Sequence, residues 1–154
     1  MGLFTKIKNT FSPPKEEYDD PIFGRLRREG TGMWMGDIPF QHPPTRTTTM
    51  SVLIGSGDGR PTDAQKDLFR EIISRYAQDW PRIAAALAER HPDLKTVEKI
   101  TQHVGEPCLI LEPIRDGQPR EWSIDYTFDL ETEGDMGYAA GFREWELLAV
   151  DAGD

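Results

Sequence analysis

The residues that could do chemistry in this sequence include a run of carboxylates near its end. Asp129, Glu131 and Glu133 alternate along the chain and are followed by Gly134, which is the spacing of the first ligands in a calcium-binding loop. The twelfth position of such a loop supplies a bidentate Glu, but here it is Ala140. The flanks also have the pattern of strands instead of helices, so the sequence predicts no dedicated calcium site.

Three histidines and one cysteine are the candidates for zinc binding or nucleophilic catalysis. His42, His91 and His103 stand far apart and belong to no H-E-x-x-H or C-x-x-C motif, so they predict no metal site. Cys108 has apolar neighbours, which favours an inert buried thiol over a nucleophile. The sequence contains no G-x-S-x-G motif, and we assign no catalytic and no cofactor-binding residue.

A Gly-rich stretch over residues 55–59 could suggest a phosphate-binding loop. It lies between a predicted strand and a predicted helix, where backbone N–H groups attract anions. It lacks the G-K-[ST] ending, and Asp58 would repel a phosphate. We therefore interpret the stretch as a connector.

Charge is distributed unevenly along the chain. The net charge is −9, and residues 112–154 contain three Lys or Arg against twelve Asp or Glu, so they carry the whole excess. An acidic surface repels nucleic acid and anionic membranes and speeds association with basic proteins. The sequence therefore predicts a basic protein partner and no nucleic-acid binding, with a surface that only maintains solubility as the alternative.

The first residues differ from the rest of the chain. Residues 1–11 have the pattern of a short amphipathic helix, whose apolar side would carry Leu3, Phe4, Ile7 and Phe11. Such a segment can lie on a membrane, but we favour docking on its own domain or fraying. With residues 15–20 as a polar linker, the predicted organisation is an N-terminal segment and linker over 1–19 and one domain over 20–154.

Other sequence features bear on the compartment. The chain has one cysteine, no signal-peptide pattern and no apolar run of membrane-spanning length. We therefore expect a soluble cytoplasmic protein. The sequence does not indicate an oligomeric state.

Alternating apolar residues predict the strands. Residues 20–40 have the pattern of two strands joined by a Gly-rich turn, with Trp34 and Gly36 on the same face. A bare position beside a large ring predicts a bulge or the close approach of another backbone at Gly36. A third strand of this meander is predicted over 48–54, a central strand over 108–114, and further strands over 122–128, 138–142 and 145–150.

Helical periodicity occupies the middle of the chain. Thr62 and Gln65 form a capping box, and the apolar spacing behind them predicts a helix to about Gln78. Pro81 is predicted to interrupt this helix and to begin a second one, and residues 94–104 predict a third. Together with the strands, this pattern predicts an α+β fold: a curved, mainly antiparallel sheet of about six to seven strands, with two or three helices packed on one face.

The opening hairpin carries a resemblance to a known group. Asp20-Pro21-x-Phe23-Gly24-x-Leu26 followed by Trp34-x-Gly36 resembles the start of a family of small, uncharacterised bacterial α+β domains. Some members of this family resemble immunity proteins encoded beside polymorphic toxins. The resemblance implies the same order of elements over residues 20–150 and a role in protein–protein interaction.

Three hypotheses for function follow. The first is a non-enzymatic immunity protein that neutralises a cognate toxin, possibly a nuclease, through a partner-binding acidic surface formed by Glu131, Glu133, Asp135, Glu144 and Glu146. The alternative is a small-molecule-binding domain, or an enzyme of unknown reaction, with a pocket between helices and sheet. The third is a peripheral membrane adaptor that uses residues 1–11, and we disfavour this membrane contact.

Overall fold

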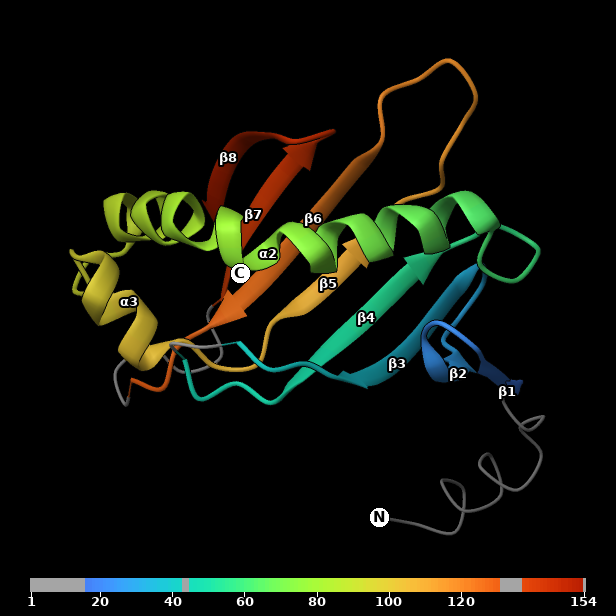
Figure 1. The fold of residues 1–154 in the computed structure, drawn as a ribbon, viewed down its shortest axis with the longest axis horizontal. Helices are drawn as coiled ribbons and strands as arrows, with labels where there is room; N and C mark the ends of the chain where they lie inside the picture. The colour runs from blue at the N-terminus through green and yellow to red at the C-terminus, as the bar shows by residue number, and fades with distance from the viewer. Residues whose placement is uncertain (1–15, 43–44, 131–136, 154) are drawn as a thin grey trace, which may run out of the picture.

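The computed structural model describes residues 16–42, 45–130 and 137–153. In this part of the chain, eight strands form one open mixed sheet that two helices accompany (Figure 1). The strand order follows the chain from β1 to β8. All neighbouring strands are antiparallel except β4 and β5, which are parallel. The α+β class and the mainly antiparallel sheet are confirmed, although the sheet has more strands than the six to seven expected.

The elements have these bounds. The helices are α2 (Asp63–Arg90) and α3 (Val97–His103). The strands are β1 (Glu17–Asp20), β2 (Gly24–Arg28), β3 (Met33–Pro39), β4 (Thr49–Gly55), β5 (Cys108–Leu111), β6 (Glu121–Thr127), β7 (Gly137–Arg143) and β8 (Glu146–Ala152).

β1 occupies residues that the sequence suggested were a polar linker. Its register pairs Glu17 with Arg27 and Asp20 with Gly24. Only the Tyr18 and Asp20 side chains of β1 turn toward the core, and the alternating Glu17 and Asp19 stay exposed. A short edge strand that is mostly charged has little apolar periodicity, which is why the pattern looked like a linker.

The Asp-Pro-x-Phe-Gly stretch forms the turn between β1 and β2. The buried Asp20 carboxylate accepts hydrogen bonds from the backbone N–H groups of Ile22, at 2.8 Å, and Phe23, at 3.0 Å. Lys66 lies 3.3 Å from the same carboxylate. Gly24 has a φ of 73°, a conformation that favours glycine. The Asp-Pro-x-Phe-Gly residues therefore stabilise the turn between β1 and β2.

Gly36 has the close backbone approach that its sequence context predicted. A Cβ at this position would lie 2.8 Å from the Arg25 carbonyl oxygen and 2.9 Å from the Leu26 side chain. The lack of a side chain at Gly36 thus lets the backbone of β2 lie close to β3. Trp34, on the same face of β3, is buried and donates from Nε1 to the Gly59 carbonyl at 3.1 Å.

α2 begins at the predicted capping box but does not end where predicted. The Thr62 hydroxyl oxygen accepts a hydrogen bond from the Gln65 N–H at 3.2 Å. The Gln65 side-chain oxygen accepts one from the Thr62 N–H at 3.0 Å. The helix then continues through Pro81 to Arg90 as one element of 28 residues. The expectation of two helices separated at Pro81 is therefore wrong.

Packing explains why Pro81 does not end α2. Its ring lies on the exposed side, and the buried stripe resumes at Ile83, Ala84 and Leu87. A proline removes one helical hydrogen bond and bends the axis, and Figure 1 shows α2 changing direction part-way along its length. Burial of the second half against the sheet outweighs that lost bond.

α2 and α3 connect the two parallel strands β4 and β5. Buried Gln65 holds the ends of both strands, because its Nε2 donates to the carbonyls of Gly55, at 2.6 Å, and Glu112, at 3.1 Å. A parallel pair requires a long crossover, and the helical middle of the chain supplies it. Thr96 caps the short α3, which replaces the longer third helix expected over 94–104.

The core lies between α2 and one face of the sheet. Phe23 packs on Phe69 with ring centroids 4.8 Å apart, and the hydroxyls of Tyr76 and Tyr126 are 2.6 Å apart in the buried centre. The apolar residues buried in this core include Phe23, Trp34, Ile38, Val52, Leu68, Ile72, Leu87, Leu111, Trp122 and Tyr126.

Candidate functional site

One face of the sheet carries no described helix, and we call it the open face. α2 crosses the opposite face (Figure 1), and α3 lies on the same side as α2, because Trp80 donates to Thr101 at 3.2 Å. The strand register arranges the open face in rows. One row runs across β2 to β6 through Arg27, Met35, Leu53, Ile110 and Ser123. The next row runs across β3 to β7 through Asp37, Ser51, Cys108, Asp125 and Ala139.

Three carboxylates surround Cys108 on the open face. Ser51 Oγ lies 2.8 Å from Asp37 Oδ1 and 2.9 Å from Glu106 Oε1. Its single hydroxyl proton can satisfy only one of these carboxylates at a time. Asp125 is the direct register partner of Cys108. The carboxylates near the thiol thus come from β3, from β6 and from the residues just before β5.

These carboxylates have no neutralising cation. Within the part of the chain that the structure describes, no Lys, Arg or His nitrogen lies within 4.0 Å of Asp37, Glu106 or Asp125. Burial raises the pKa of Asp125 above its ordinary value, because partial desolvation disfavours the charged form. The cluster therefore concentrates uncompensated negative charge on a half-buried surface.

Cys108 is half-buried on the open face instead of fully buried as expected. Burial, and then the charges of Asp125, Glu106 and Asp37, raise the pKa of its thiol to about 11. A thiol with this pKa is protonated at neutral pH and is a poor nucleophile. The expected inert character is thus supported by its surroundings, although the predicted dry environment is wrong.

The residues predicted to bind a partner fall into two groups. Glu131, Glu133 and Asp135 lie outside the described residues. In the sequence they precede β7, which begins at Gly137, whereas Glu144 and Glu146 follow the other end of this strand. A strand of this length spans about 20 Å, so the structure attaches the two groups at opposite ends of β7.

Glu144 and Glu146 have different surroundings. Glu144 occupies the β7–β8 turn with a φ of 50° and binds Arg120, whose Nε donates to its carboxylate at 2.8 Å. Hydrogen bonds from Arg120 hold the pKa of Glu144 below its ordinary value. Glu146 is exposed and pairs in register with Arg143 on the open face. Glu144 therefore holds a turn, and Glu146 remains accessible to a partner.

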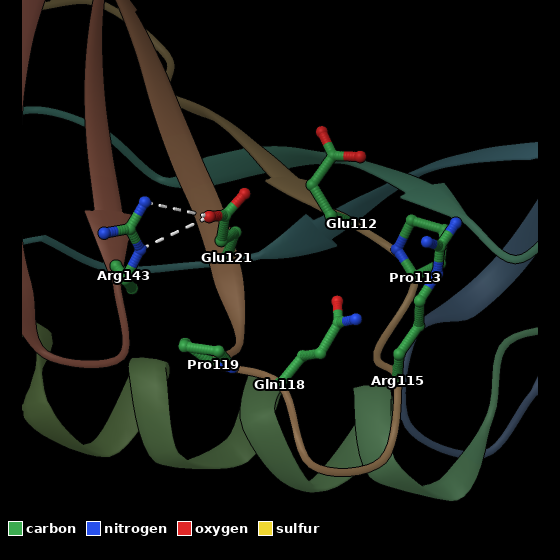
Figure 2. Close-up of a pocket in the computed structure, with 7 residues that line it drawn as sticks. All are labelled: Glu112, Pro113, Arg115, Gln118, Pro119, Glu121 and Arg143. Atoms are coloured by element: carbon green, nitrogen blue, oxygen red, sulfur yellow. Dashed lines mark hydrogen bonds and ion pairs between the residues drawn. The ribbon is translucent and has the colours of Figure 1, made fainter.

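A polar hollow of about 470 Å³ borders the open face where the β5–β6 loop meets β6 and β7. Figure 2 shows Arg143 directed at Glu121, and both its Nε and its Nη2 lie 3.4 Å from Glu121 Oε1. The hollow is lined by Glu112, Pro113, Arg115, Gln118, Pro119, Glu121 and Arg143. It mixes both charges and contains no Ser, Cys or His, so its lining suits a polar contact better than nucleophilic catalysis.

A second hollow lies between α2, the β1–β2 turn and the end of β3, where the small-molecule hypothesis expects a pocket. It has a volume of about 440 Å³ and is mostly apolar, with Phe69 and Ile73 among its lining residues. Its carboxylates are already engaged, because Asp20 binds the backbone and Lys66, and Asp37 faces Ser51. The convergent free polar groups of a ligand site are not seen among its described lining residues.

The three histidines stay separate in the fold. His42 is buried against the rings of Phe40, Tyr76 and Trp80, with centroids 4.5 to 5.8 Å away, and its Nε2 has no hydrogen-bond partner. His103 Nδ1 lies 2.9 Å from Asp129 at the surface. Within residues 16–42, 45–130 and 137–153, no three His, Cys, Asp or Glu residues form a group that could hold a metal ion.

We compared the chain with protein-family models, curated proteins and solved structures. None of them matches it. In the described part of the chain, neither helix has the length and apolar character needed to cross a bilayer. The resemblance of the opening hairpin to immunity-type domains stays a prediction.

Sequence reasoning missed the carboxylates around Cys108. Asp37 and Asp125 alternate with apolar residues in their strands, and this period placed each on the polar side of its own strand. Their meeting depends on the parallel pairing of β4 with β5, which brings β3 and β6 to either side of one surface. Strand order is the missing information, and no local pattern supplies it.

Proposed function

We propose that this protein is a non-enzymatic binding protein of the immunity type, which neutralises a basic toxin through an acidic surface. The observation that carries the proposal is the open face, where carboxylates without cations lie among half-buried apolar side chains. Surfaces of this kind attract basic partners and exclude nucleic acid. The resemblance of the opening hairpin and the excess charge of residues 112–154 support the same class.

The contact would use the accessible carboxylates of the C-terminal strands. Asp125 on β6 and Glu146 on β8 are the described residues best placed for it, and Glu131, Glu133 and Asp135 belong to the same acidic stretch of sequence. A nuclease suits this chemistry as the partner, because its substrate-binding surface must be basic. Occupying that surface would block access of the nucleic acid.

The experiment is co-expression with the product of the neighbouring gene, after its basic charge and its toxicity to the host have been established. We expect restored growth and a purified complex whose Kd rises with NaCl concentration. Glu146→Lys should weaken the complex about tenfold, mainly by slowing association. Glu89→Lys, at an exposed α2 position without an ion pair among the described residues, is the matched control for net charge. Failure to restore growth, or equal weakening by both variants, would contradict the proposal.

A further inference from the structure

The open face carries a row of three apolar side chains that are partly exposed to solvent. Met35, Leu53 and Ile110 are adjacent in the register of β3, β4 and β5, and each is partly exposed to solvent. Three neighbouring apolar side chains on one flat surface lose contact with water when a chain segment lies across them. This row therefore favours an apolar occupant.

The adjoining row requires the occupant to be positively charged as well. Asp37, Glu106 and Asp125 approach one another around Cys108, with no cation beside them among the described residues. Their mutual repulsion, and the partial burial of Asp125, are relieved when a positive charge arrives. The complementary occupant is a segment that carries apolar side chains beside lysines or arginines.

The chain itself contains such a segment. Residues 1–15 contain Lys6, Lys8 and Lys15 and no Asp or Glu. The same residues also contain Leu3, Phe4, Ile7 and Phe11, at the spacing noted for one side of a helix. The segment therefore matches both rows of the open face in composition.

The strand register places the start of β1 beside the apolar row. Glu17 pairs with Arg27, which pairs with Met35, so the chain preceding β1 enters the sheet in line with Leu53 and Ile110. From β1 to β5 there are four strand spacings, or about 19 Å. Fifteen residues can extend to about 50 Å, so residues 1–15 are long enough to cross this row.

We propose that the open face is the docking site of the chain's own residues 1–15. The apolar side chains of the segment cover Met35, Leu53 and Ile110, and its lysines meet the carboxylates around Cys108. The inference goes beyond the proposed function and does not depend on it, because it involves this chain alone. If a basic partner also binds the open face, it must displace the segment.

Cys108, the only cysteine of the chain, lies within this docking site and reports on its coverage. The test measures the rate at which an uncharged disulfide reagent such as 4,4′-dithiodipyridine modifies Cys108 in the folded, full-length protein. A segment docked nine-tenths of the time slows the reaction about tenfold. We therefore expect about tenfold faster modification in Lys6→Glu/Lys8→Glu and in Phe4→Ser/Ile7→Ser, and in the wild type at high NaCl concentration.

Two controls separate docking from other effects. Thr10→Ala lies in the same segment and should leave the rate unchanged. In an Asp37→Lys/Asp125→Lys background, Lys6→Glu/Lys8→Glu should slow the modification of Cys108, the opposite of its effect in the wild type, because the charges are exchanged across the contact. A faster rate on adding Lys6→Glu/Lys8→Glu to this background, with folded circular dichroism spectra, would overturn the charge contact.

Three results would overturn the proposal as a whole. The first is a rate that differs less than twofold between wild type and both segment variants. The second is protection of Cys108 that appears only as protein concentration rises, which would assign the open face to a second copy. The third is an unchanged rate together with binding to vesicles of equal phosphatidylglycerol and phosphatidylcholine that Lys6→Glu/Lys8→Glu abolishes, which would assign the segment to a membrane.

Discussion

The two faces of the sheet use similar strands for opposite purposes. Leu111 and Ile110 are adjacent in β5, yet Leu111 is fully buried under α2 while Ile110 is partly exposed on the open face. Polar groups differ in the same way. Under α2, Tyr76 meets Tyr126 and Gln65 meets two carbonyls, whereas Asp37 and Asp125 on the open face have no cation. Strand alternation places the larger apolar side chains toward α2, and coverage by this helix completes the core on that face.

The largest expected effect separates two neighbouring residues of β5. Leu111→Ala should lower the free energy of unfolding by about 3 kcal/mol, because it leaves a cavity in the core. Ile110→Ala should cost about 1 kcal/mol, because its side chain is already partly in water. Urea unfolding of both variants measures the difference. Equal losses would show that the open face is as well packed as the covered one.

His42 is an exception on the covered side, because its buried Nε2 has no hydrogen-bond partner. Burial lowers its pKa to about 4, so the folded protein favours the neutral ring. The stability that comes from keeping the His42 ring neutral is fully present above pH 6.5, the ordinary pKa of His, and is lost as the pH falls toward 4. We expect the folded protein to lose about 2 kcal/mol of stability between pH 7 and pH 5, because His42 takes up a proton more readily when the chain is unfolded.

Unfolding at these two pH values tests the role of His42. His42→Leu should unfold with a smaller pH dependence than the wild type, because the titrating group is gone. His103→Gln is the control, since His103 lies at the surface with Asp129. If His42→Leu and the wild type lose equal stability on acidification, another group causes the loss.

Two glycines provide a third comparison of the faces. Gly36→Ala should cost about 2 kcal/mol, because the new Cβ would lie 2.8 Å from the Arg25 carbonyl oxygen. Gly141→Ala on the open face should be neutral or stabilise by about 0.5 kcal/mol, because the nearest atom would be 3.9 Å away. Thermal unfolding measures both, and a large loss for Gly141→Ala would contradict the view that its side of the sheet has room.

The smallest expected effect concerns the charges of the open face. In the Lys6→Glu/Lys8→Glu background, where residues 1–15 are not docked, Asp125→Asn should be neutral or raise the free energy of unfolding by about 0.5 kcal/mol, because burial already penalises the charged form of this residue. The gain should shrink at high NaCl concentration, which screens the repulsion from Asp37 and Glu106. A clear loss of stability in this background in low salt would mean that Asp125 has a cationic partner other than residues 1–15.

Patterns local to one element predicted most of the fold. Period two located β3, β4 and β6, and the Thr62–Gln65 capping box located the start of α2. These signals succeed because burial of one face acts on neighbouring residues of the same element. The continuous apolar stretch over 108–114 correctly predicted that β5 is a central strand, although Cys108 and Ile110 are only half-buried.

Features that depend on distant contacts could not be predicted. Pro81 was expected to end a helix, but packing of Ile83 and Leu87 on the sheet keeps α2 continuous. The sequence also counts Glu144 as part of an acidic surface, whereas its pairing with Arg120 requires the β6–β7 register. The cluster around Cys108 has the same origin, because four strands must first take their order.

The central claim is that one face of the sheet forms the core and the other receives a cationic segment. Paramagnetic broadening tests it most directly, with a nitroxide attached in the Asn9→Cys, Cys108→Ser variant of the full chain. The account predicts strong broadening of the amide signals of Met35, Leu53 and Ile110, and little at Leu87 and Ala88 on α2. Weak and equal broadening at both sets of residues would contradict it.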